Sequence, residues 1–147
     1  KFYFGDFPDQ QLDSIPSLKI NKFLEKIISK HKPKIVFTTP NHDLNNDHSI
    51  VHNSTLVACR PLVSSVMKLF CYELPGYVKN PFEPNVFEDI SKEINFKINA
   101  FKLYKSEIEK FPHPRSLDSI VNLSIQRGVQ SGLKNAESFY LIFSKSL

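Results

Sequence analysis

The spacing of apolar residues predicts strands and helices in alternation. Helices are expected where apolar residues recur every three or four positions, at 17–30, 47–59, 91–110 and 116–130. Short apolar runs bounded by turn-forming or charged residues predict extended segments at 1–4, 34–39, 67–74, 85–90 and 136–143. A strand, a helix and a strand in that order favour a crossover between parallel strands. We therefore predict an α/β fold with 1–4 and 34–39 as parallel neighbours and with the helix at 17–30 on one face.

A polar loop follows the strand at 34–39 and leads into the helix at 47–59. In open α/β sheets, ligands bind at this kind of junction, where strands end. His48 and His52 lie four residues apart, so on a helix both point to one side and have the spacing of metal ligands. Asp43 and Asp47 offer carboxylates beside them. Histidines four apart also occur on ordinary solvated helices, and two histidines alone are an incomplete zinc site.

A second polar constellation is His113 with Arg115, in an extended loop that Pro112 and Pro114 stiffen. A guanidinium presents a planar fork of donors, which suits recognition of an anion or a hydroxyl. The alternative is a surface loop with incidental charges.

Composition narrows the classes of protein that fit. The 147 residues suffice for a single domain over 1–147 with a real core. The net charge of +4 comes from scattered Lys and Arg, so we expect no nucleic-acid partner. No apolar run is long enough to predict a membrane span. Cys59 and Cys71 have apolar surroundings and no CxxC spacing, which predicts buried free thiols in a reducing compartment and a cytoplasmic protein.

Several segments, in order along nearly the whole chain, resemble the LmbE/PIG-L family of zinc-dependent N-deacetylases, in its bacterial sugar de-N-acetylase branch. They lie at 43–48, 51–52, 58–61, 82–91, 112–116, 127–128 and 136–139. The resemblance implies a Rossmann-like parallel sheet flanked by helices. It also implies removal of an acetyl group from an N-acetylated amino sugar or glycoside, with zinc or another divalent metal as cofactor.

The resemblance also assigns roles to residues of this chain. His48 matches a metal ligand of the family. The residues assigned to catalysis are Asp47, His52 and His113, and those assigned to substrate binding are Asp43, Asn45, Arg60 and Arg115. We expect His48 to face an open cleft with His113 on its far wall. In such enzymes the metal polarises the acetamide carbonyl, and a carboxylate passes a proton from water to the amine.

One departure from the family is large. The family's other metal ligands and its general base lie in a His-Pro-Asp-Asp-Glu motif, which this sequence lacks. We therefore expect the chain to begin past that motif and the sheet to lack its first strand. The exposed edge would then be covered by a longer parent chain or by a partner, a homo-oligomer being one form. Asn45 stands where some members have a histidine.

Two other functions compete with the hydrolase. One is a non-catalytic sugar-binding or assembly module on the same fold, which the missing motif favours. The other is a dinucleotide-binding domain, against which stands the absence of GxGxxG from the sequence.

Overall fold

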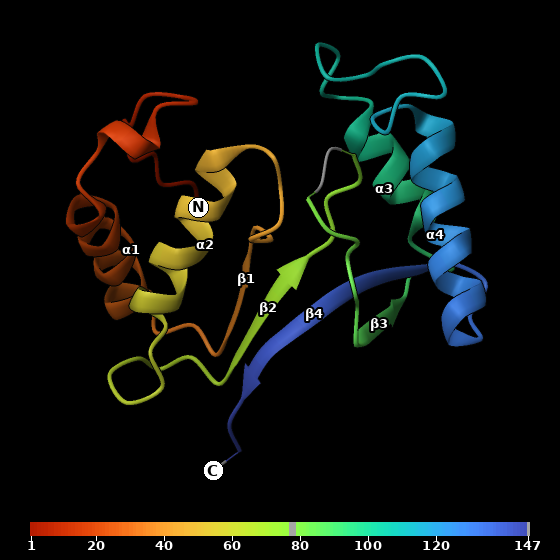
Figure 1. Ribbon diagram of the computed structural model, residues 1–147. Coiled ribbons are helices and arrows are strands. Elements are labelled where there is room, and N and C mark those ends of the chain that lie inside the picture. Colours follow the sequence, from red (N-terminus) through yellow and green to blue (C-terminus); the bar gives the residue numbers. More distant parts are fainter. Residues whose placement is uncertain (77–78, 147) are drawn as a thin grey trace. The chain divides into compact units, whose positions relative to one another are not determined.

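The computed structural model describes residues 1–76 and 79–146, and its strands form one four-stranded sheet in the order β1-β2-β4-β3 (Figure 1). The elements are η1 (Leu12–Ser14), α1 (Ser17–His31), β1 (Ile35–Thr38), α2 (Asn46–Ala58), β2 (Lys68–Tyr72), β3 (Val86–Asp89), α3 (Ile94–Phe101), α4 (Leu117–Ser131) and β4 (Ala136–Ser144). β1 and β2 are parallel, whereas β3 and β4 are antiparallel. The predicted α/β class is confirmed, with a mixed sheet. No described helix has the length and apolar character of a membrane span.

The chain folds as two compact units. The first is drawn from residues 1–82 and 140–147, and the second from residues 83–139. β4 contributes residues to both, because its first four residues belong to the second unit and the rest to the first. The loop between β1 and α2, which carries the candidate site, lies in the first unit.

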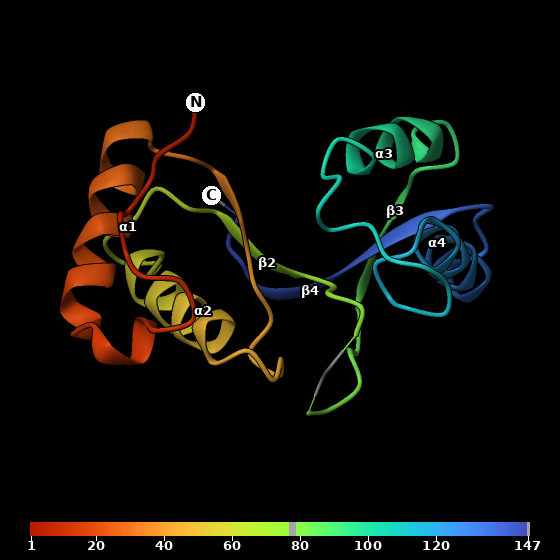
Figure 2. The ribbon, with the colours of Figure 1, turned by 90° about the horizontal axis from the view of Figure 1, so that it is seen from above.

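The core of the first unit lies between the β1–β2 pair and two helices. α1 packs against α2, and both lie on the same side of the two strands (Figure 2). In the parallel register Val36 is opposite Leu69 and Phe37 is opposite Phe70. Alternation along the strands turns Val36 and Leu69 toward the helices, and leaves Phe37 half-exposed on the other face. The buried members of the core are Ile28, Ala58, Cys59, Val66 and Leu69.

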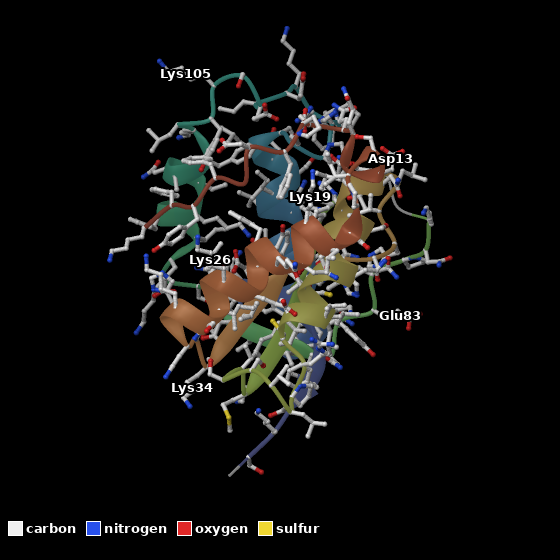
Figure 3. All side chains as sticks on the ribbon, turned by 90° about the vertical axis from the view of Figure 1, so that its left-hand side faces the viewer. Asp13, Lys19, Lys26, Lys34, Glu83 and Lys105 are labelled. Carbon is white, nitrogen blue, oxygen red and sulfur yellow. The ribbon has the colours of Figure 1, made fainter. Side chains whose placement is uncertain are left out.

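The helix at 17–30 was predicted correctly from its apolar stripe, of which Ile20 and Ile28 are buried. Lys19 and Lys26 project from the outer side of α1 (Figure 3). The helix ends at Lys32, whose left-handed backbone lets its N–H donate to the carbonyl of Ile28.

The prediction of a strand at 1–4 is wrong. These residues are irregular, and the parallel neighbour of β1 is β2. Phe2 and Phe4 are 90% and 81% exposed, whereas the Tyr3 hydroxyl bonds to Nε2 of His31 at 2.5 Å. The aromatic run therefore contacts the end of α1 through one side chain, and its apolar pattern does not reflect sheet pairing.

In the second unit, α3 is shorter than the helix predicted at 91–110. It ends at Phe101, and two turns follow. In the first the N–H of Tyr104 donates to the carbonyl of Phe101, and in the second the N–H of Glu107 donates to the carbonyl of Tyr104. Tyr104, which lies on the apolar stripe of that predicted helix, is largely exposed. A helical apolar pattern without a surface to cover it does not extend the helix. α4 begins as predicted, with the Ser116 side chain accepting from the N–H of Ser119.

The two core cysteines yield the first testable prediction. Cys59 and Cys71 are buried free thiols, as expected, and burial raises the pKa of each from 9.0 to about 11. In mildly alkaline buffer their thiolate fraction should be about a hundredfold below that of an ordinary thiol. We expect mass spectrometry after iodoacetamide treatment to find neither cysteine alkylated in native protein and both alkylated in denaturant. Rapid labelling of either thiol in native buffer would contradict the burial described here.

Candidate functional site

The loop between β1 and α2 is held by its own polar side chains. Asn45 is the N-cap of α2, because its side-chain oxygen accepts from the N–H of Asp47 at 3.0 Å. The N–H of Asn45 in turn donates to Oδ1 of Asp43 at 2.7 Å. These bonds fix where α2 begins and place the Asp43 carboxylate beside the first turn of the helix. Asn45, predicted to bind substrate, therefore has a structural role here.

His48 and Asp43 form the central pair of the site. Nδ1 of His48 lies 2.9 Å from Oδ2 of Asp43, and the side chains are 33% and 14% exposed. Burial acts to raise the pKa of Asp43, but hydrogen bonds from Asn45 and His48 and the charge of His48 outweigh it and lower that pKa. An ionised Asp43 accepts the Nδ1 proton, so Nε2 becomes the free basic atom of the ring. An imidazole held in this way suits proton transfer or metal ligation.

Two further side chains interact electrostatically with the carboxylate of Asp43. The charge of His42 contributes to lowering the pKa of Asp43. The His42 ring lies 5.5 Å from the Phe82 ring, and its Nε2 is buried without a hydrogen-bond partner among the described residues. At the end of β2, burial raises the pKa of Tyr72, and the charges of Cys71 and Asp43 add to this. The sequence prediction missed His42 and Tyr72. Both lie at the carboxyl ends of strands, and knowing that these two strands are adjacent could have identified them.

Asp47 and His52, both predicted to be catalytic, make contacts within the fold. Oδ1 of Asp47 accepts from the N–H of Leu12 at 3.0 Å, which ties η1 to α2. His52 is only 9% exposed, and its Nδ1 lies 2.9 Å from the carbonyl oxygen of Thr39. Each side chain thus has a structural partner, and the catalytic roles of the two residues stay predictions.

Arg60 is not brought to the Asp43–His48 pair. It follows the C-terminal end of α2, whereas His48 lies in the first turn, and a helix of that length spans about 20 Å. Its guanidinium instead pairs with Glu25 of α1 at 3.2 Å. The geometry therefore gives no support to substrate binding by Arg60 at this site.

His113 and Arg115 lie in the second unit. They sit in consecutive turns and not in the extended loop that the sequence predicted. Nδ1 of His113 accepts from the N–H of Arg115 at 3.1 Å, and the Arg115 guanidinium pairs with the carboxylate of Glu107. The cleft with His113 opposite His48 stays a prediction, as do the catalytic role of His113 and the substrate contact of Arg115.

The described residues do not by themselves fit a catalytic zinc. Among residues 1–76 and 79–146, no three or more His, Cys, Asp or Glu side chains are grouped so that they would hold a metal ion. A catalytic zinc takes three protein ligands and keeps a position open. Here His48 offers one imidazole, and the carboxylate of Asp43 is hydrogen-bonded to Nδ1 of that ring.

A protein-family model matches the part of the chain that contains this site. The model described as PIG-L: GlcNAc-PI de-N-acetylase matches residues 1–59, which include β1, the polar loop and α2. No curated protein sequence matches the chain.

Three solved structures share the fold. The conserved protein TT1542 from Thermus thermophilus has a TM-score of 0.75 and 21% identity over 96% of this chain and 65% of its own. The 4-carboxy-2-hydroxymuconate hydratase GalB from Pseudomonas putida has a TM-score of 0.69 and 16% identity over 88% of this chain and 60% of its own. The N,N'-diacetylchitobiose deacetylase from Pyrococcus horikoshii has a TM-score of 0.66 and 15% identity over 97% of this chain and 55% of its own. This chain thus spans 55–65% of the length of these relatives, and the similarity establishes the fold.

The capping role of Asn45 gives the second prediction. Asn45→Ala removes the oxygen that accepts from Asp47 and should lower the free energy of unfolding by about 1 kcal/mol. The matched control is Asn46→Ala at the neighbouring exposed position, expected to change it by less than about 0.5 kcal/mol. Urea unfolding measures both. Equal effects of the two substitutions would contradict the assignment of the cap.

Proposed function

We propose that this chain carries the His–Asp part of the active site of a deacetylase-type amide hydrolase. The observation that carries the proposal is the bond between Asp43 and Nδ1 of His48, at the carboxyl end of a parallel strand. The family model supports it, because its matched span contains this pair and its description names a de-N-acetylase.

The proposed substrate is the N-acetyl group of an amino sugar or a glycoside. Support comes from the name of the matching family, which refers to GlcNAc-PI, and from one structural relative, a deacetylase of N,N'-diacetylchitobiose. The fold alone does not select this reaction, because another relative is a hydratase. The His–Asp pair inside the matched span is what favours hydrolysis of an amide.

His48 and Asp43 have complementary roles in the proposed reaction. Hydrolysis of an amide requires a proton to be taken from the attacking water and one to be given to the leaving amine. With its Nδ1 proton held by Asp43, His48 exchanges protons at Nε2. The ionised carboxylate stabilises the imidazolium that forms and keeps the ring in one orientation.

Zinc or another divalent metal is proposed as a cofactor in an alternative use of the same imidazole, that of His48, because an Nε2 that ligates a metal cannot also exchange protons. The described residues supply no set of further ligands around it, so the proton transfer proposed for His48 and Asp43 involves no metal. Measurement of the metal content tests the cofactor separately from the reaction.

The third prediction concerns catalysis by His48. Release of acetate from N,N'-diacetylchitobiose should fall at least a hundredfold in His48→Ala, since an acid–base group contributes about 10²–10⁴-fold. Asp43→Asn should reduce it less, because the ring remains but loses its anionic partner. The control is His31→Ala at the end of α1, where His31 contacts Tyr3 and activity should be unchanged.

The outcomes separate this function from its competitor. Full activity in His48→Ala would contradict the proposal. Binding of the sugar without acetate release in the unmodified protein would instead support the non-catalytic sugar-binding module.

The fourth prediction uses metal content as a readout that does not depend on turnover. If His48 ligates zinc, His48→Ala should lower the zinc-to-protein ratio in elemental analysis together with deacetylation. His113→Ala should leave that ratio unchanged and reduce turnover or substrate affinity. An unchanged zinc content in His48→Ala would remove the metal from the proposal.

A further inference from the structure

We propose that Thr39 is a positioning residue, which holds the first turns of α2 so that His48 faces Asp43. Thr39 directly follows β1 and is 9% exposed. Its hydroxyl donates to the carbonyl oxygen of His48 at 2.7 Å. The inference rests on the proposed function only for its effect on turnover, because its geometry can be tested without any activity.

The backbone of Thr39 connects the same helix a second time. Its carbonyl oxygen lies 2.9 Å from Nδ1 of His52, and it also accepts from the thiol of Cys71 at 3.6 Å. One residue at the end of β1 thus contacts two consecutive turns of α2 and the neighbouring strand β2. A shift of α2 along its axis, or a rotation about it, would stretch both bonds that Thr39 makes to the helix, one to His48 and one to His52.

These bonds matter because His48 lies at a helix end. The first turn of a helix has fewer internal hydrogen bonds than its middle, so its position depends on outside contacts. Asn45 caps the free N–H of Asp47 there, and the Thr39 hydroxyl fixes the carbonyl of His48, in the same turn, to the end of β1. The Asp43 carboxylate, five residues before His48, meets Nδ1 only while that turn keeps its place.

A buried threonine is also consistent with a purely structural role, since a buried hydroxyl needs a partner wherever it lies. Thr55 provides the comparison. It is buried on the same helix, donates to the carbonyl of Val51 at 2.7 Å and accepts from Thr38. Thr55 lies two turns beyond His48, so loss of its hydroxyl should loosen α2 without disturbing the His48–Asp43 bond in particular.

The test compares the tautomer of His48 across matched variants of the full chain. Long-range ¹H–¹⁵N NMR of the imidazoles should show His48 with its proton on Nδ1, the nitrogen that faces the Asp43 carboxylate. Thr39→Val and Thr39→Ala should give a mixture of tautomers. Thr39→Ser keeps the hydroxyl and should retain the Nδ1–H form, as should Thr55→Val.

Kinetics provide the second readout. Thr39→Ala should lower kcat by about tenfold or more relative to Thr39→Ser, with KM unchanged, because small displacements of a catalytic group are costly. Serine and alanine differ by one oxygen, so this pair tests the hydroxyl even if the valine variant does not fold.

The outcomes are distinguishable from those of the proposed function. A wild-type tautomer in Thr39→Ala, or an equal change in Thr55→Val, would overturn the positioning role. A tautomer change confined to Thr39→Val and Thr39→Ala would support that role even in a protein that releases no acetate, in which case only the proposed function fails.

Discussion

The parallel pairing of β1 with β2 determines where chemistry is possible in the first unit. Because parallel strands end at the same edge, the pairing brings the loop after β1 next to Tyr72 at the end of β2. The same pairing places Leu69 under α1 and α2, so the core and the site depend on one set of ladder bonds. Thr39 extends this constraint into α2, where His48 lies.

Much of the fold is predictable from the sequence where the signal is local. Apolar periodicity locates Ser17–His31, and periodicity together with the Ser116 cap locates Leu117–Ser131, both to within two residues, because amphipathicity and capping act over a few positions. The segment 1–4 has a strand-like composition, yet strand formation needs a partner that composition does not specify. The overlong helix at 91–110 fails for a related reason, since an apolar stripe does not specify whether a surface covers it, and Tyr104 is 64% exposed.

The candidate site was predictable only in part. The sequence identifies the polar loop and His48, but the spacing of His48 and His52 suggested a pair that the structure does not form. His52 turns to the carbonyl of Thr39, and the partner of His48 is Asp43, five residues earlier in the loop. Such a contact depends on the path of the loop, which helical periodicity does not describe. Tyr72 was missed because its relevance follows from strand adjacency.

β4 gives the chain an unusual sensitivity to length. Its residues 136–139 pair with β3 in the second unit, and the residues from 140 onward belong to the first. Side chains on a strand alternate between faces, so one residue inserted near the middle of β4 would reverse every side chain beyond it. Ile142 and Phe143, which pack against the core of the first unit, would exchange faces. Insertions and deletions should therefore be tolerated in the turns at 102–110 but not in β4, even at positions remote from the candidate site.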